Sequence, residues 1–432
     1  MLMTSVVKGS SAFLFTGVCK MFENLWKHIT KTYAQQICLG LAALPIGVIV
    51  GMIDAVFGQT LLKITAFRQL YPLYLIPFLP LAGVLIVYCY QRFGKNSSKG
   101  MNLIFEAGHG DEEVIPMRLI PFVISGTWIT HLFGGSAGRE GVAVQIGATF
   151  SHWVGRHIPM KNAPKIFLVA GMAAGFAGLF QTPIAAVLFA LEVLVASEIR
   201  YDALFPALVA SFAASMTSGW MGLEKFTFAL SDTMTLDPVM MIKLLAAGAV
   251  FGIVGGAFAW SLKKAKEIFA ARFVNPLIRI AVIAICLSIL FILLDQGRYS
   301  GLGTNLIDFS FHGGMIYSWD WILKFALTVI TLAAGFQGGE VTPLFSIGAS
   351  LGVVIASFFH LPVAFMAALG YAAVFGGATN TFFAPMLIGA EVFGFAYLPY
   401  FFVVCAAAYV FNMNKSIYSL QKVKKLHDDD NE

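Results

Sequence analysis

The chain has 432 residues, of which 58% are hydrophobic and 12% charged, about half of the roughly 25% charged residues typical of soluble domains. The net charge of +5 is modest, and the basic residues gather beside apolar runs, at Arg92–Lys99, Arg156–Lys165, Lys263–Lys266 and Lys415–Lys425. This distribution is typical of cytoplasmic loops and does not favour nucleic-acid binding. The composition excludes an ordinary soluble domain and predicts an all-α polytopic membrane protein.

Residues 1–34 are expected to precede the first membrane repeat. The apolar stretch at residues 11–18 is too short to span a bilayer, and no typical signal-peptide cleavage site follows it. Phe22–Tyr33 is amphipathic and is expected to form an interfacial helix on the membrane surface. Translation could begin at Met1 or at Met21.

Several apolar runs are long enough to cross a bilayer, which takes about 20 helical residues; among them are Ile37–Phe57, Leu70–Tyr90, Leu244–Leu262 and Ile278–Leu294. Shorter, interrupted segments at residues 117–133, 138–153, 182–197 and 341–358 are predicted to be tilted or partial spans. Such spans occur where the freed backbone is buried in protein or lines a wet cavity. The five cysteines are scattered without metal or disulfide spacing, so we expect neither a metal nor a cofactor.

An internal duplication is visible in the second half of each repeat. The segment from Gly171 to Val193 aligns without a gap with the segment from Gly370 to Val392, with ten identical residues in 23 positions. About 30 residues upstream of each lies a glycine-rich turn that contains an acid. Glycines in these positions also permit close helix packing. However, paired broken segments in two halves are typical of a transporter with a site near the membrane midplane.

The turn Gly138-Arg139-Glu140-Gly141 is predicted to open a half-length helix. A carboxylate at membrane depth is costly, and such residues usually have a function. A helix N-terminus presents free N–H groups and the positive end of its dipole, which makes it an anion site. We therefore interpret Glu140 as an acid that competes with an anion and carries a proton. The alternative is a charged surface loop, which the apolar flanks do not favour.

The two turns together resemble those of the CLC chloride channel and transporter family. The resemblance rests on Gly138–Gly141, on Gly338-Gly339-Glu340-Val341-Thr342-Pro343, on the helix Ala174–Glu192 and on Lys415-Ser416-Ile417-Tyr418, and it covers about residues 35 to 425. It implies a CLC-like fold of two inverted repeats of tilted and partial-span helices. It also implies a homodimer with one anion pathway per subunit and both termini in the cytoplasm.

The resemblance also implies roles for individual residues. Glu140 matches the gating glutamate that occupies an anion site and moves outward when protonated. Tyr418 matches a tyrosine whose hydroxyl donates to the central anion, and the backbone amides of Gly141, Val142, Val341 and Thr342 match those that line the pathway. Gly138, Arg139 and Glu340 are expected to support the loops. Arg139 should orient its loop by hydrogen bonding, and Glu340 has no assigned role.

One departure from the family pattern concerns the anion site itself. Where the family usually has Gly-Ser-Gly-Ile-Pro, this chain has Gly100-Met101-Asn102-Leu103-Ile104, and the thioether of Met101 cannot donate a hydrogen bond to an anion as serine does. Val142 replaces a proline, and Val193 stands where an inner glutamate is common. These departures resemble the fluoride-exporting branch, the bacterial fluoride/proton antiporters.

For several residues, the sequence allows both a functional and a structural role. Met101 either narrows the site against larger halides or simply packs, and Tyr418 either binds the anion or is an ordinary interfacial tyrosine. The Thr342 hydroxyl and the Asn102 amide either face the anion or act as caps. Phe105 could direct the edge of its ring toward the pathway. By their placement, the paired acids Glu192 and Glu391 favour structural partners over a proton relay, and His131 favours packing over ligand binding.

The sequence therefore predicts a transporter in the bacterial inner membrane that exports fluoride from the cytoplasm in exchange for protons. Two membrane repeats, residues 35–220 and 221–426, are followed by a short acidic tail at residues 427–432, with no soluble regulatory domain expected. The main alternative is a chloride/proton antiporter or a passive chloride channel of the same fold. An intramembrane hydrolase is disfavoured, since the sequence has neither Gly-x-Ser-x-Gly nor His-Glu-x-x-His.

Overall fold

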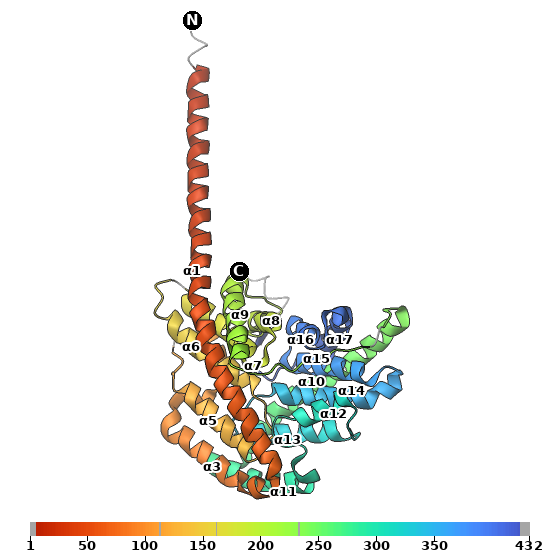
Figure 1. The fold of residues 1–432 in the computed structure, drawn as a ribbon. Coiled ribbons are helices and arrows are strands. Elements are labelled where there is room, and N and C mark those ends of the chain that lie inside the picture. The colour runs from red at the N-terminus through yellow and green to blue at the C-terminus, as the bar shows by residue number, and fades with distance from the viewer. Residues whose placement is uncertain (1–5, 112–113, 161, 232–233, 424–432) are drawn as a thin grey trace.

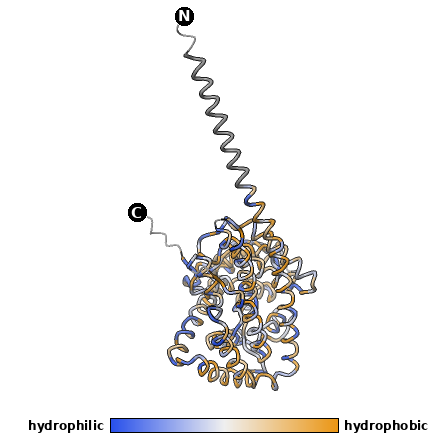
Figure 2. The backbone as a smooth tube through the Cα atoms, turned by 90° about the vertical axis from the view of Figure 1, so that its left-hand side faces the viewer, coloured by the Kyte–Doolittle hydropathy of each residue, from blue (hydrophilic) through white to orange (hydrophobic). Residues whose placement is uncertain are grey.

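The computed structural model describes residues 6–111, 114–160, 162–231 and 234–423, with side chains from Tyr33 onward. The acidic tail at residues 427–432 therefore lies outside the described residues. The described chain is almost entirely helical (Figure 1), and hydrophobic residues predominate along its helices (Figure 2). Seven of its helices are long and apolar enough to cross a membrane. The predicted all-α membrane protein is confirmed.

The first predicted spans differ in detail from the structure. Helix α1 (Val6–Leu70) runs without a break through the predicted interfacial segment and the first predicted span. The second predicted span, Leu70–Tyr90, is divided into α2 (Pro72–Leu75), a 3-10 turn (Ile76–Phe78) and α3 (Leu79–Cys89). Each of these short elements has a proline at its first or second position, where the missing N–H costs nothing.

The remaining helices form two series in the same order. The first series ends with α4 (Met101–His109), α5 (Leu119–Leu132), α6 (Glu140–Gly155), α7 (Ala163–Phe180), α8 (Pro183–Glu192) and α9 (Leu204–Trp220). The second consists of α10 (Pro238–Arg272), α11 (Pro276–Leu293), α12 (Thr304–His312), α13 (Asp320–Ala334), α14 (Val341–Phe359), α15 (Val363–Thr379), α16 (Phe383–Phe393) and α17 (Leu398–Phe411). The duplication predicted from the sequence is present in the fold. Three of the four interrupted segments are helices of 10 to 16 residues (α5, α6 and α8), whereas α14, predicted as a partial span, has 19 residues and is long enough to cross a membrane.

In each series, two consecutive helices pack closely against each other at glycines: α6 against α7, and α14 against α15. A Cβ atom on Gly147 of α6 would overlap the carbonyl oxygen of Gly171 on α7. In the second series, a Cβ atom on Gly348 of α14 would overlap the carbonyl oxygen of Gly370 on α15. The glycines thus let the two backbones of each pair touch, which is the usual basis of close helix packing in membranes.

Two acids, the buried Glu192 and the partly buried Glu391, each cap a helix of the opposite repeat. At the end of α8, the Glu192 carboxylate accepts hydrogen bonds from the backbone N–H groups of Phe382, Phe383 and Ala384, at 3.2, 3.1 and 2.8 Å, where α16 begins. Reciprocally, the Glu391 carboxylate on α16 accepts from Ile184 and Ala185, at 3.3 and 2.8 Å, where α8 begins. The carboxylates satisfy N–H groups that have no partner within their own helix. The prediction of symmetric structural partners is confirmed.

A buried lysine connects the second repeat to the loop before α6. The Lys324 ammonium on α13 is fully buried and donates to the Ser136 hydroxyl at 2.9 Å and to the carbonyls of Tyr299 and Gly301 at 3.1 and 2.7 Å. Within the described part of the chain, no carboxylate pairs with it. One turn earlier, Asp320 binds Arg298 at 2.7 Å, which holds the loop that supplies the two carbonyls. Three neutral acceptors therefore bind this ammonium in place of water.

The same loop is held from the other side by His131 on α5. Its Nδ1 lies 2.8 Å from the carbonyl oxygen of Thr127, and its Nε2 lies 2.9 Å from that of Ala137. The side chain is fully buried. The prediction that His131 packs with its polar atoms partnered is confirmed, and its partner Ala137 directly precedes the glycine turn.

We predict that Gly147→Ala destabilises the protein by about 1–3 kcal/mol, because the added methyl group would overlap the α7 backbone. Thermal unfolding of the detergent-solubilised protein measures the effect. Gly219→Ala on α9 is the matched control, since the nearest atom to its added Cβ lies at 3.7 Å. Equal melting temperatures for the two variants would contradict the packing argument.

We also predict that Lys324→Met destabilises the protein, by roughly 1–3 kcal/mol for each buried acceptor left without a donor. The same unfolding assay is suitable. Lys63→Met removes an exposed lysine from α1 and should leave the melting temperature unchanged. A Lys324→Met protein as stable as the parent would show that the three hydrogen bonds do not support the loop.

Candidate functional site

The first turns of α6 and α14 meet inside the protein. Gly138 and Gly339 form an isolated antiparallel bridge, in which the Gly138 N–H donates to the Gly339 carbonyl and the Gly339 N–H donates to the Gly138 carbonyl at 2.8 Å. A Cβ atom on Gly138 would lie 2.9 Å from the Pro343 ring and 3.0 Å from the Gly339 oxygen, so only glycine permits this approach. The bridge brings two helix N-termini, one from each repeat, to the same point.

The Glu140 carboxylate lies at the N-terminus of α14. It is buried, and it accepts hydrogen bonds from the Thr342 hydroxyl at 2.7 and 2.6 Å and from the Thr342 amide at 3.1 Å. The Arg139 amide contributes a weaker contact at 3.3 Å. A negative charge is favourable there, because the helix dipole and the first-turn N–H groups point at it. The carboxylate thus occupies a position that suits an anion.

Arg139 differs from the prediction. Its Nε lies 3.6 Å from the Glu140 carboxylate, whereas Nε and Nη1 have no hydrogen-bond partner among the described residues. Its contact is therefore with the charge of Glu140, where we expected a hydrogen bond that orients the loop. The guanidinium is mostly buried, so the attraction is less screened than at a surface.

Val142 also differs from the prediction. Its amide donates to the Arg139 carbonyl at 3.1 Å and is therefore not a free donor for an anion. Of the predicted pathway amides, that of Thr342 faces the Glu140 carboxylate. The side chains of Val142 and Val341 are buried in the hydrophobic core.

A cavity of about 420 Å³ adjoins this junction. The predicted residues Met101, Asn102, Gly141, Glu340 and Tyr418 all line it. Three lysines contribute to its wall as well (Lys99, Lys263 and Lys266), of which Lys99 pairs with Glu106 at 2.6 Å. Two acids, Glu267 and Glu340, line it too, so the cavity is polar and its basic groups outnumber its acidic ones by one.

Met101 and Glu340 approach the pathway turn from opposite repeats. A Cβ atom on Gly141 would lie 3.9 Å from the Met101 methyl carbon and 3.8 Å from the Glu340 Oε2. Glu340 precedes α14 but makes no side-chain cap, and Met101 is the first residue of α4. The Asn102 amide oxygen accepts from the Ser419 hydroxyl at 3.1 Å, next to Tyr418, and α4 has no side-chain cap, so Asn102 does not act as a cap in this structure.

Tyr418 lies on a segment that is tied to both repeats. The Ile417 amide donates to the Ala378 carbonyl at 2.9 Å at the end of α15. A few residues later, β2 (Lys422–Val423) pairs in parallel with β1 (Val195–Ala196), just after α8. The Tyr418 ring is buried, and within the described chain its hydroxyl has no hydrogen-bond partner. The hydroxyl is thus available to a ligand.

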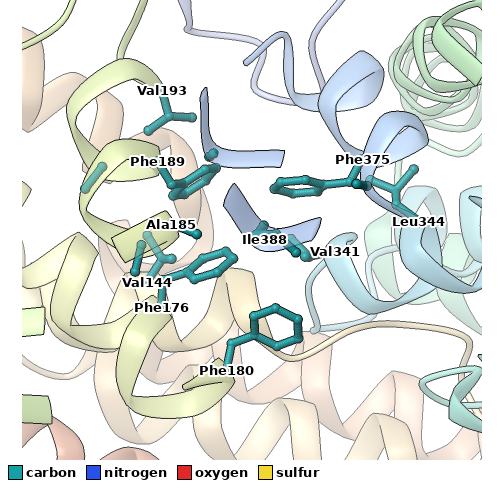
Figure 3. Close-up of a cluster of buried hydrophobic side chains, with 14 of the residues drawn as sticks. Val144, Phe176, Phe180, Ala185, Phe189, Val193, Val341, Leu344, Phe375 and Ile388 are labelled. Atoms are coloured by element: carbon teal, nitrogen blue, oxygen red, sulfur yellow. The ribbon is translucent and has the colours of Figure 1, made fainter. Parts of the chain in front are cut away.

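Aromatic rings connect Tyr418 to the core between the repeats. Tyr418 stacks on Phe105 at 5.2 Å and meets Phe189 at 6.3 Å, and Phe189 lies 6.1 Å from Phe375 of the other repeat. Figure 3 shows Phe189 and Phe375 facing each other across this cluster. Phe105 therefore supports Tyr418 by stacking.

Two residues were not predicted from the sequence: Gln145 at the site, and Lys324, which supports the loop before α6. Gln145 lines the cavity and donates to the Gly141 carbonyl at 3.2 Å, and its buried Oε1 has no partner among the described residues. It could have been found, because it lies one helical turn after Gly141 on the same face. Lys324 could have been found as a charge within an apolar segment. Among the described residues, no cluster of three or more His, Cys, Asp or Glu could hold a metal ion.

Comparisons with known proteins agree with this geometry. The chain is 36% identical over 395 residues to a chloride/fluoride channel protein of Pseudomonas syringae pv. tomato, covering 89% of this chain and 86% of that protein. It resembles the crystal structure of a CLC-type fluoride/proton antiporter with a TM-score of 0.89 and 55% identity, covering 91% and 99% of the two chains. A slow cyanobacterial Cl⁻/H⁺ antiporter shares the fold, with a TM-score of 0.78 and 22% identity over 88% and 96% of the two chains.

The sequence profile of the voltage-gated chloride channel family matches residues 82–413, which contain both glycine turns and every helix from α4 to α16. The matched range thus includes the duplicated helices, both paired turns and Glu140. The chain belongs to the voltage-gated chloride channel (CLC) family of multi-span membrane proteins.

Proposed function

We propose that this protein is a secondary active transporter that exports fluoride in exchange for protons. The observation that carries the proposal is the Glu140 carboxylate at the N-terminus of α14, next to a cavity lined by Met101. Two comparisons support fluoride as the substrate: the 55% identity to a fluoride/proton antiporter and the 36% identity to a chloride/fluoride channel protein. The proposal includes residence in the bacterial inner membrane, a homodimer and two cytoplasmic termini.

Proton coupling follows from the position of Glu140. While ionised, the carboxylate occupies the helix N-terminus and excludes a second anion by charge and by volume. Once protonated, Glu140 has no charge, so it is no longer attracted to the dipole of α14, and its hydrogen bond from the Thr342 amide becomes weaker. An anion can then take its place, and the displaced acid carries one proton to the opposite side. Each exchange thus moves a proton against an anion.

The anion path uses the cavity and the two turns. Lys263 and Lys266 attract anions to the cavity, and the free hydroxyl of Tyr418 offers the first hydrogen bond. The N–H groups of Gly141, Val341 and Thr342 lie at the N-termini of α6 and α14 and provide the remaining donors. The Thr342 hydroxyl, which now holds Glu140, can donate to an anion in the same position.

Selectivity is assigned to Met101. Its methyl carbon lies close to the Gly141 turn, at the place where a serine of chloride-transporting relatives would donate to the anion. A thioether supplies bulk without a donor, so a larger halide loses both space and a hydrogen bond. A small anion can still reach the backbone donors.

Efflux from proteoliposomes that are loaded with fluoride or with chloride, with external pH recorded at the same time, tests the proposal. Fluoride efflux that drives protons inward, with little chloride efflux, is the expected result. Comparable chloride efflux would instead favour a chloride/proton antiporter, and anion efflux without proton movement would favour a passive channel.

We predict that Glu140→Gln abolishes proton movement while the protein stays folded, because the amide cannot take up and release a proton. The remaining anion transport should no longer respond to an imposed proton gradient, whereas transport by the parent protein should be driven by one. Glu106→Gln is a suitable control, since Glu106 pairs with Lys99 at the edge of the cavity. Proton-coupled transport at the parent rate in Glu140→Gln would refute the role.

We predict that Met101→Ser raises chloride transport relative to fluoride, because the hydroxyl adds a donor where the methyl group narrowed the site. A hydrogen bond to a charged group contributes about 1.5–3 kcal/mol, so the preference should shift by roughly tenfold or more. Competition between the two halides in the same liposomes measures it. Met315→Ser, at an exposed position, is the control. An unchanged preference would exclude Met101 as the selectivity residue.

A further inference from the structure

A second polar cavity of about 440 Å³ lies between the C-terminal end of α3 and the N-terminal end of α11. Its wall consists of Ile86, Val87, Tyr90, Gln91, Lys95, Ser98, Pro276, Arg279, Gly335 and Gln337. None of these described lining residues is acidic. The cavity therefore carries a net positive charge that comes from Lys95 and Arg279.

Arg279 is the unusual member of this wall. Its Nε is buried and has no hydrogen-bond partner, and its guanidinium makes no ion pair with any described residue. The Nη2 atom points toward the linker after α13, since a Cβ atom on Gly335 would lie 3.8 Å from it. A buried donor without an acceptor is costly, so the site is complete only when an acceptor enters the cavity.

The two helices that border the cavity have exposed apolar sides. On α3, Leu81 and Leu85 are exposed, and on α11 Ile278, Val282 and Ile285 are exposed, which places apolar surface on both sides. Ile86, Val87 and Pro276 continue this apolar surface into the cavity. The basic groups thus lie next to two helices with apolar outer sides, where α3 ends and α11 begins.

We propose that this cavity binds the phosphate group of an anionic phospholipid. The Arg279 guanidinium presents paired N–H donors that match phosphate oxygens, Lys95 adds a second positive charge, and the dipole of α11 favours an anion at its N-terminus. The exposed apolar side chains of α3 and α11 accommodate the upper part of the acyl chains. A free phosphate ion would leave this apolar surface uncovered. Basic pockets between helices at the membrane interface are a recurrent form of lipid recognition.

Lipid binding in this cavity would affect the candidate anion site through the linker between α13 and α14, which borders both cavities. Gly335 and Gln337 line both this cavity and the cavity that holds Met101 and Tyr418. Gln337 accepts from the Tyr90 hydroxyl at 3.2 Å and directly precedes the Gly338 turn. A lipid phosphate on Arg279 would therefore steady the linker that leads into α14.

Lipid binding to the full chain, delipidated in detergent, tests the proposal without any transport assay. The protein is titrated with phosphatidylglycerol or with phosphatidylcholine, and bound lipids are counted by native mass spectrometry. The parent protein should prefer phosphatidylglycerol, and Arg279→Gln should weaken its binding about tenfold or more, the usual effect of losing a charge-assisted hydrogen bond. Arg272→Gln, an exposed arginine at the end of α10, should bind as the parent does.

Four outcomes would overturn the proposal. Phosphatidylglycerol could bind equally to the parent and to Arg279→Gln, or it could be lost equally from Arg272→Gln. Inorganic phosphate at millimolar concentration could displace the lipid completely, which would indicate a free-phosphate site. Arg279→Lys preserves the positive charge but loses the paired N–H donors, so it should bind phosphatidylglycerol more weakly than the parent while still preferring it to phosphatidylcholine, and loss of that preference would count against the proposal.

Discussion

A helix that begins inside a membrane leaves N–H groups that lipid cannot satisfy, and this protein meets that constraint with carboxylates from the opposite repeat. Glu192 binds the start of α16 through three backbone N–H groups, which is a fixed arrangement. Glu140 binds the start of α14 through one backbone N–H of that helix and a hydroxyl, which can rotate. Two acids with the same type of partner thus differ in how firmly they are held. The acid with fewer backbone N–H partners is the one beside the polar cavity, which agrees with the movement proposed for Glu140.

The fold was largely predictable because its main signals are local. The duplication, the glycine turns and the short apolar segments are all visible along the chain, and each corresponds to an observed helix or turn. The position of Glu140 was predictable for the same reason, because an acid between glycines in an apolar stretch has few structural uses. Thr342 was recognised as a candidate, but its direct contact with Glu140 joins residues that lie 202 positions apart. Such contacts depend on how the repeats meet, which no local pattern records.

The predictions that were wrong or absent concern contacts of the same kind, between residues that only the tertiary fold brings together. Arg139 was expected to bond to its loop, yet the fold directs its Nε toward the neighbouring carboxylate. The Val142 amide was assigned to the pathway, although the first turn of α6 uses it internally. Lys324 is partnered by carbonyls of a loop and by Ser136, none of which is close to it in sequence. In each case the residue type was visible, but its partner was set by tertiary packing.

The reciprocal caps have a consequence for the order in which the chain matures. When α8 leaves the ribosome, the acid that will cap its N-terminus, Glu391, has not yet been synthesised. The N–H groups of Ile184 and Ala185 must therefore stay in contact with water, with lipid headgroups or with the insertion machinery until α16 arrives. Neither half can reach its final hydrogen bonding alone. Biogenesis of this protein is thus completed only when its last helices join the first ones, whatever the speed at which each helix inserts.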